Sequence, residues 1–242
     1  MKEKLYAIPV NDAFSGDCEC PVCLMRKTLE DAAIEYTMGP SYMEDDTRMQ
    51  TDEKGFCQKH MEMIYTSGNK LGIALILKTH FDRVIRETSS LSEKTDEKKG
   101  LFKKTASDGK SPLLSYLEKL NSSCFVCERI GQVFDRYIDT IFYLWKSDST
   151  FKERYTHSNG FCNEHFRLLM EKAPDSLRGS DLDEFVTITR QLYQSNMERV
   201  RDDLAWFIDK FDYRNADAPW KNSKDAIPRA MIKSNGIIQN DK

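Results

Sequence analysis

The feature that most constrains this chain is a pattern of cysteine and histidine that occurs twice. Residues 20–23 read CPVC and residues 124–127 read CFVC, while residues 55–60 read GFCQKH and residues 160–165 read GFCNEH. The first motif recurs after 104 residues and the second after 105, so the two copies keep almost the same internal spacing. Such constant spacing indicates that one folded unit has been duplicated.

The repeated residues are the donors that a structural zinc site uses, since three thiolates and one imidazole form one of its closed four-ligand shells. Two residues between paired cysteines let a tight turn aim both sulfurs at one ion. A Cys-x-x-His pair brings sulfur and imidazole together at the first turn of a helix. Because local pairing is the simplest arrangement, the sequence predicts two structural zinc ions, bound by Cys20/Cys23/Cys57/His60 and by Cys124/Cys127/Cys162/His165.

Two alternatives stay open at this point. Cys20 and Cys23 can instead share an ion with Cys162 and His165, across the copies. Iron or an iron–sulfur cluster also uses these ligand types. Buried free cysteines without metal would be the ordinary reading of isolated residues, but six of the seven cysteines and two of the four histidines fall into the repeated spacing.

The remaining cysteine and histidines lie outside the repeated pattern. Cys18 has Ser122 as its counterpart in the second copy, so it is either an incidental thiol or an exchangeable ligand that responds to oxidants. His80 and His157 have no counterparts, and we expect them on the surface or in packing contacts.

Small and aromatic residues precede each Cys-x-x-His pair. Gly55 and Gly160 suit a sharp entry into the site. Phe56 and Phe161 follow them, and we expect their rings to cover the metal and restrict water.

Apolar residues that recur every three or four positions predict an all-α fold. The clearest stripe runs from Ile130 to Phe142, and a weaker one runs from Leu24 to Tyr36. A third helix in each copy is predicted over Leu71–Ile85 and over Leu182–Phe211. No alternating pattern typical of strands competes with these stripes.

The chain therefore reads as two tandem helical repeats, each clamped by a Cys3His zinc site. A segment rich in Ser, Lys, Asp and Gly separates them and predicts a linker or mobile loop. The C-terminal tail is expected to be irregular, because Pro219 and Pro228 discourage long helices, and Trp220 is expected to hold it on the body. The predicted boundaries are 1–88 for the first repeat, 89–112 for the linker, 113–214 for the second repeat and 215–242 for the tail.

Charge and hydropathy indicate the expected cellular compartment and the kinds of partner. The formal net charge of -3 gives no global attraction to nucleic acid or to an anionic membrane. The longest aliphatic run, Leu71–Leu77, is far shorter than the roughly 20 residues that span a bilayer. The first residues, MKEKLYAIPVNDAF, contain no signal-peptide core. We therefore expect a cytosolic protein, whose reduced thiols hold metal rather than form disulfides.

The repeated CxVC and GFCxxH elements, the first of which reads ECPVC at residues 19–23, are followed by FDYRN at Phe211–Asn215 and by PWKNSKDA at Pro219–Ala226. Together they resemble an uncharacterised bacterial family, and the resemblance spans nearly the whole chain. Some members of that family carry the label of ABC-transporter substrate-binding protein. This sequence lacks the export signal or lipid-attachment cysteine that such a protein needs. The resemblance therefore implies a fold and not a function.

Three functions are compatible with these sequence patterns. The first is a binding or scaffold module with structural metal, whose partner is an unknown protein or small ligand. Its expected contact surfaces are the cleft between the copies and Trp220–Arg229. The second is a zinc–thiolate redox sensor. The third is nucleic-acid binding through the basic run Lys221, Lys224, Arg229 and Lys233. The common hydrolase, nucleotide-binding and metalloprotease motifs are missing, so no enzyme is predicted and no catalytic residue is assigned.

Overall fold

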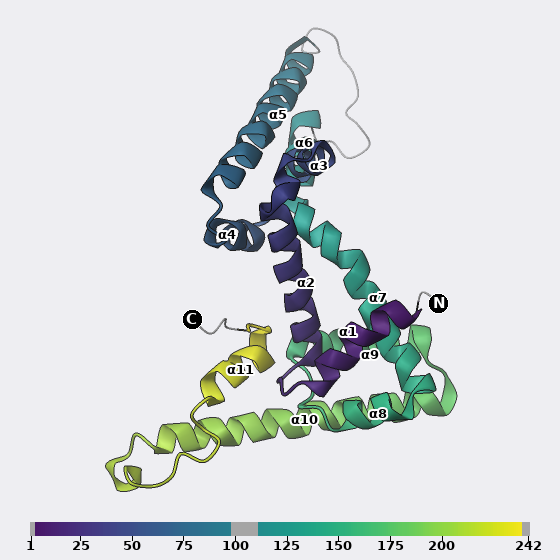
Figure 1. Ribbon diagram of the computed structural model, residues 1–242, viewed down its shortest axis with the longest axis vertical. Helices are drawn as coiled ribbons and strands as arrows, with labels where there is room; N and C mark the ends of the chain where they lie inside the picture. The colour runs from purple at the N-terminus through teal and green to yellow at the C-terminus, as the bar shows by residue number, and fades with distance from the viewer. Residues whose placement is uncertain (1–2, 98–110, 239–242) are drawn as a thin grey trace. The chain divides into compact units, whose positions relative to one another are not determined.

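The computed structural model describes residues 3–97 and 111–238, and within these ranges the secondary structure is entirely helical (Figure 1). The prediction of an all-α fold is therefore confirmed. The described residues form the α-helices α1 (Glu3–Ser15), α2 (Pro21–Met38), α3 (Asp45–Lys54), α4 (Gln58–Thr66), α5 (Lys70–Glu97), α6 (Pro112–Ser122), α7 (Phe125–Ser147), α8 (Ser149–Thr156), α9 (Asn163–Ser176), α10 (Gly179–Asp209) and α11 (Ala226–Asn235). Short 3-10 turns lie at Pro40–Met43 and Tyr213–Asn215.

The duplicated sequence appears as a repeated order of five helices. Helices α1–α5, purple to blue in Figure 1, correspond in order to α6–α10, teal to green. Helices α2 and α7 begin inside the CxxC motifs, while α4 and α9 begin directly after Cys57 and Cys162. The four apolar stripes of the sequence lie in α2, α5, α7 and α10, and α11 has no counterpart.

The chain divides into two compact units. Unit 1 contains residues 1–28 and 133–242, and unit 2 contains residues 29–132. This division differs from the boundaries predicted from the sequence, because each unit joins elements of both copies. In unit 1, α1 packs on α8 of the second copy, while in unit 2, α6 of the second copy packs on α5 of the first. Helices α2 and α7 each begin in one unit and end in the other.

The core of unit 1 is aromatic. The ring of Phe14 on α1 stacks on Tyr155 of α8, with a centroid separation of 5.4 Å. Tyr155 also contacts Phe161 and Phe185, at 5.3 Å each. Its hydroxyl lies 2.8 Å from the hydroxyl of Thr189 on α10, so the buried phenol has a hydrogen-bond partner. These contacts join α1 and α8 to the long helix α10.

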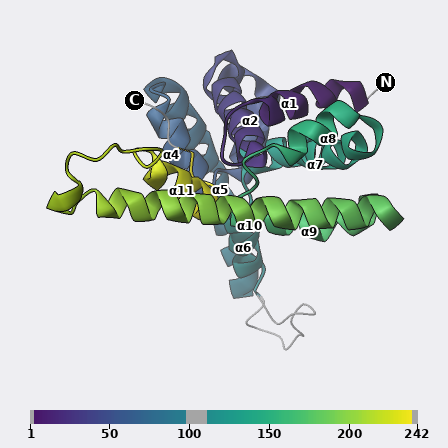
Figure 2. The same ribbon diagram turned by 90° about the horizontal axis from the view of Figure 1, so that it is seen from below.

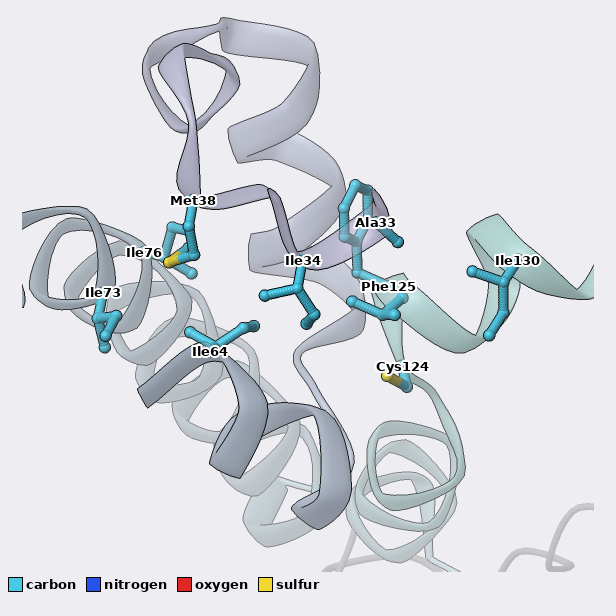
Figure 3. Packing of buried hydrophobic residues seen from close by; sticks show 10 residues of the cluster. Ala33, Ile34, Met38, Ile64, Ile73, Ile76, Cys124, Phe125 and Ile130 are labelled. Carbon is cyan, nitrogen blue, oxygen red and sulfur yellow. The ribbon is translucent and has the colours of Figure 1, made fainter. Parts of the chain in front are cut away.

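The core of unit 2 is mainly aliphatic. Buried side chains of α2, α4, α5 and α7 form one cluster (Figure 3). Cys124 belongs to this cluster, so the start of α7 is packed into the core of the unit. Helix α5 also lies against α3 and α6. The cluster consists of Ala33, Ile34, Met38, Ile64, Ile73, Ile76, Cys124, Phe125, Val126 and Ile130.

The predicted linker and tail differ from the structure in part. Of the linker at 89–112, residues 89–97 belong to α5, and residues 98–110 lie outside the described residues. The tail is not irregular throughout, because it contains α11. Pro228 is the third residue of this helix, where its missing N–H removes no helical hydrogen bond. Helix α11 packs on α9 and α10 (Figure 2).

Trp220 connects the chain before α11 to the end of α10. Its ring lies 5.8 Å from that of Phe207, and the indole N–H of Trp206 donates to the carbonyl of Pro219 at 3.0 Å.

No helix in residues 3–97 and 111–238 combines the length and apolar character that crossing a bilayer requires.

Candidate metal centres

The eight predicted ligands form two groups of four, but the groups are crossed between the copies. Within each group, one donor atom per residue lies within 4.8 Å of the others. The local pairing preferred from the sequence is wrong, and the alternative pairing across the copies is observed. Site 1, in unit 1, consists of Cys20, Cys23, Cys162 and His165; site 2, in unit 2, consists of Cys57, His60, Cys124 and Cys127.

Helix lengths explain the crossing. At about 1.5 Å per residue, the 18 residues of α2 carry the chain roughly 27 Å from Cys20, and the ten residues of α3 cover only about 15 Å. In the second copy, the 23 residues of α7 rise about 35 Å and the eight of α8 about 12 Å. The returning helix is too short to bring a GFCxxH motif back to its own CxxC.

In site 1 the donor atoms are spaced as they would be around one ion. Nδ1 of His165 lies 3.5 Å from Sγ of Cys20, 3.2 Å from Sγ of Cys23 and 3.2 Å from Sγ of Cys162. The sulfurs of Cys23 and Cys162 are 3.5 Å apart. Tetrahedral zinc, with bonds of about 2.3 Å to sulfur and 2.0–2.1 Å to nitrogen, would place sulfurs about 3.8 Å apart and sulfur and nitrogen about 3.6 Å apart.

Site 2 repeats this arrangement. Nδ1 of His60 lies 3.2 Å from Sγ of Cys57 and 3.3 Å from Sγ of both Cys124 and Cys127. The sulfurs of Cys57 and Cys127 are 3.9 Å apart. All seven cysteines are free, and these separations are well beyond the roughly 2.05 Å of a disulfide bond. Each of the two groups therefore fits one four-coordinate ion of its own.

Sharp turns at two glycines position the second motif of each copy. Gly55 has a φ of 58° and Gly160 a φ of 77°, values that side chains rarely adopt. A Cβ on Gly160 would also lie 2.9 Å from the carbonyl oxygen of Leu192. Cys57 and Cys162 then become the N-cap residues of α4 and α9, which places each histidine in the first turn of a helix. The predicted role of the two glycines is confirmed.

Backbone N–H groups stabilise one thiolate in each site. The N–H of His165 donates to Sγ of Cys162 at 3.4 Å, and the N–H of Cys127 donates to Sγ of Cys124 at 3.5 Å. Burial alone would raise the pKa of Cys124, but its hydrogen bonds with His60 and with the backbone of Cys127 lower the pKa to about 6. Hydrogen bonds from the thiols of Cys20 and Cys23 lower the pKa of Cys162. Each site thus contains a sulfur that favours the metal-binding form.

The two sites differ in enclosure. All four ligands of site 1 are buried. In site 2, His60 and Cys124 are buried, Cys57 is half-buried and Cys127 is exposed. Cys127 is therefore the residue of site 2 that is most open to solvent.

Helix α11 closes site 1. A Cβ on Gly236, the residue that ends α11, would lie 3.3 Å from Sγ of Cys23 and 3.9 Å from Sγ of Cys162. The buried ammonium of Lys233 donates to the carbonyl of Glu19 at 2.7 Å and to the carbonyl of Asn159. Glu19 directly precedes the CxxC motif, and Asn159 directly precedes the GFCxxH motif. Lys233 therefore fastens both ligand-bearing loops to α11.

A buried carboxylate completes this anchor. Glu19 accepts two hydrogen bonds from Nη2 of Arg199, at 2.8 Å and 2.6 Å, and its Oε2 lies 3.1 Å from Nζ of Lys233. The two cations neutralise the buried negative charge, as a buried carboxylate requires.

Site 2 joins its loops without an extra helix. Ser123, which stands where the first copy has Glu19, donates its hydroxyl to the carbonyl of Lys54 at 2.7 Å. Lys54 is the counterpart of Asn159. The N–H of Phe125 also donates to the carbonyl of Gly55 at 3.0 Å. A direct contact in site 2 thus replaces the lysine bridge of site 1.

The outer nitrogens of the histidines face different neighbours. Nε2 of His60 lies 3.6 Å from Oε1 of the buried Glu30 on α2. The counterpart of Glu30 in the second copy is Phe134, whose ring lies 5.8 Å from that of His165. Burial opposes the charged form of His60, but the thiol of Cys124 and the carboxylate of Glu30 outweigh it and raise the pKa of His60 to about 9.

Cys18, His80 and His157 belong to neither group of ligands. Sγ of Cys18 lies 3.8 Å from the carbonyl of Ala13, and burial raises its pKa to about 11, which disfavours a reactive thiolate. Nδ1 of His80 and Nδ1 of His157 each lie 2.8 Å from a backbone carbonyl. Of the aromatic residues expected over the sites, Phe161 packs in the core of unit 1, and Phe56 contacts Phe125.

The basic run of the tail is partly internal. Lys233 is buried under Glu19, and Arg229 pairs with Asp203 at 2.8 Å and with Asp225 at 2.9 Å. These two cations already have acidic partners, which leaves Lys221 and Lys224 as the exposed members of the run.

Periodicity and ligand spacing did not indicate Glu19, Glu30 or Lys233 as parts of the sites. Glu19 and Lys233 are 214 residues apart, so no local pattern connects them. The sequence does contain one indication that Glu30 has a buried partner: it is a charged residue on the otherwise apolar face of α2, next to Ala33 and Ile34.

The model of a family of unknown function, DUF6062, matches residues 1–241. No curated protein and no solved structure matches the chain.

Proposed function

The chain belongs to the DUF6062 family of unknown function, and we propose that it is a cytosolic zinc protein in which two ions hold a helical binding or scaffold module together. The observation that carries this proposal is the convergence of three sulfurs and one imidazole nitrogen, twice, within 4.8 Å. The closed donor set leaves no open coordination position, which is typical of structural rather than catalytic zinc.

The spacing of the sulfurs favours a single ion over a cluster. Sulfurs that bind different irons of a cluster must be separated by the cluster itself, whereas the Sγ atoms here are 3.5 Å and 3.9 Å apart. Zinc also suits a reducing compartment, since it has no redox chemistry of its own and binds thiolate and imidazole tightly.

Elemental analysis and native mass spectrometry of protein purified without added metal test this proposal. We expect about two zinc ions per chain, and loss of helical structure when a strong chelator removes them, because metal binding supplies folding free energy. Protein that folds fully with no bound metal, or with an iron–sulfur chromophore, would contradict it.

A second candidate function, a thiol redox sensor, is favoured by the exposure of Cys127 and its 3.9 Å separation from Cys57. A bound ion would hold the sulfur of Cys127 as a thiolate, and a hydroperoxide would oxidise this thiolate to a sulfenic acid and leave as an alcohol or water. The Cys57 thiolate would then attack this sulfur and expel hydroxide, which forms a disulfide and frees the zinc of site 2.

Peroxide titration with a colorimetric zinc indicator separates the two candidates. A sensor releases one zinc ion per chain with formation of the Cys57–Cys127 disulfide, and a thiol reductant reverses both changes. The Cys18→Ser variant should behave like the parent, because Cys18 is outside both sites. A static scaffold would keep both ions under the same mild oxidation.

A further inference from the structure

A cavity of about 310 Å³ lies in unit 2, next to the loop that carries Cys57. Its walls come from α4, α5 and the turn that joins α3 to α4. They are mostly apolar, with one imidazole among them, which is the composition expected of a small-molecule site. The lining residues are Gly55, Phe56, Met61, Ile76, Leu77, His80 and Phe81.

The imidazole of His80 presents a hydrogen-bond acceptor to this cavity. Nδ1 lies 2.8 Å from the backbone carbonyl oxygen of Asp52. A carbonyl only accepts, so Nδ1 carries the proton, and the tautomer that carries only this proton has a lone pair on Nε2. The ring is turned toward Gly55, where an added Cβ would meet Cε1 at 3.0 Å and Nε2 at 3.2 Å.

At the corresponding place in unit 1, two aromatic rings stack on each other. Phe166 is the counterpart of Met61, and its ring stacks on Tyr193 of α10 with the centroids 4.1 Å apart. Gly160, the counterpart of Gly55, faces the backbone carbonyl of Leu192 in place of an imidazole. The two copies therefore differ at this place, and the imidazole beside the glycine is present in the first copy only.

We propose that this cavity binds a small, planar and largely apolar molecule that carries one N–H or O–H donor, which bonds to Nε2 of His80. The apolar walls favour burial of an aromatic body. A charged ligand would lose hydration without gaining a countercharge, because none of the lining side chains is an acid, a lysine or an arginine. The donor is required because the lining imidazole offers an acceptor.

This inference deepens the proposed function by naming a class of ligand for the module. The site adjoins a metal centre, since Phe56 lines the cavity and is followed in the chain by Cys57. Zinc content is measured separately, so failure of the ligand site leaves the metal assignment intact, and the reverse also holds.

Isothermal titration of the full, metal-loaded chain with indole and with 1-methylindole tests the donor requirement. The two probes differ in the N–H group. We expect indole to bind about fivefold more tightly, the effect of roughly 1 kcal/mol for one hydrogen bond. Equal affinities of the two probes, or no binding of indole up to its solubility limit, would overturn the proposal.

Variants locate the binding. His80→Phe should reduce the preference for indole to about one, while His157→Phe, the matched change at an exposed histidine, should leave it unchanged. Leu77→Trp should fill the cavity and abolish binding of both probes, with circular dichroism confirming that the variant is folded. Indole-induced chemical shift changes at His80 in NMR spectra provide a readout that does not depend on Leu77→Trp. Unchanged binding in folded Leu77→Trp, or indole shifts confined to residues outside α4 and α5, would refute the assignment.

Discussion

Site 1 and site 2 have the same four ligand types at nearly the same distances, yet they differ in what surrounds them. Every ligand of site 1 is buried, and α11 lies over its sulfurs through Gly236. Site 2 leaves Cys127 exposed, and the hydroxyl of Ser123 joins its two loops where site 1 uses Lys233.

Different parts of the sequence therefore determine the spacing of the ligands and their protection from solvent. The two copies share the motifs that supply the cysteine and histidine donors. The residues that close or open each site lie outside the motifs, on α11 and at positions 19, 30, 123 and 134, where the copies differ. We infer that site 1 is the permanent structural anchor and that site 2 is the more exchangeable centre.

The largest expected effect comes from removing one buried ligand. Cys162→Ser should destabilise the protein by several kcal/mol, a substantial part of the roughly 10 to 16 kcal/mol that structural zinc contributes in small domains. Cys127→Ser should cost less, because water reaches that position and can replace the sulfur. Thermal unfolding, with the zinc content measured in parallel, shows which of the two variants loses more stability. Cys18→Ser serves as the control. Equal losses would remove the distinction between the sites.

The next effect concerns the lysine that holds α11 over site 1. Lys233→Met should cost about 3 kcal/mol, because the carbonyls of Glu19 and Asn159 lose a charged donor and the carboxylate of Glu19 loses the ammonium beside it. Zinc exchange should accelerate in site 1 and not in site 2. The exposed Lys224→Met is the matched control. If site 2 exchanged faster instead, α11 would not be the cover described here.

A smaller effect is expected from the carboxylate beside His60. Glu30→Gln should weaken zinc binding at site 2 by about 10-fold to 100-fold, because partners of the outer histidine nitrogen orient the ligand and raise its basicity. Competition with a chelator of known affinity measures the change. Glu164→Gln, which alters an exposed carboxylate next to His165, should have no such effect. A loss of zinc from site 1 would show that the pairing of Glu30 with His60 is misassigned.

The smallest effect is that of a single hydroxyl. Ser123→Ala should reduce the free energy of unfolding by about 1 kcal/mol, because the carbonyl of Lys54 loses a hydrogen bond. The matched control in denaturant titrations is Ser122→Ala, because the hydroxyl of Ser122 donates to the carbonyl of Lys119 in its own helix. Equal effects of the two variants would mean that the loop contact contributes nothing specific.

Much of this framework could be predicted from the sequence, because it depends on local patterns. The motif spacing identified all eight residues of the two Cys/His groups, and apolar periodicity identified α2, α5, α7 and α10. The crossed pairing could not be derived this way. Helices α3 (DDTRMQTDEK) and α8 (STFKERYT) are too polar and too short to be recognised from a stripe, so the length of the return path was unknown.

The burial of site 1 beneath α11 could not be predicted from the sequence for a different reason. It depends on contacts between Lys233 and two carbonyl groups that belong to distant loops. Backbone carbonyls have no sequence signature, and a lysine in a polar tail is ordinarily exposed. The basic run around Lys233 therefore suggested a surface for nucleic acid, whereas the structure gives this residue an internal role.

Native mass spectrometry of two double variants tests the crossed pairing most directly. Cys20→Ser/Cys162→Ser removes two ligands from site 1 only, so it should keep about one zinc ion, whereas Cys20→Ser/Cys57→Ser damages both sites and should keep none. The opposite result, with one ion retained by Cys20→Ser/Cys57→Ser and none by Cys20→Ser/Cys162→Ser, would restore local pairing and contradict this account.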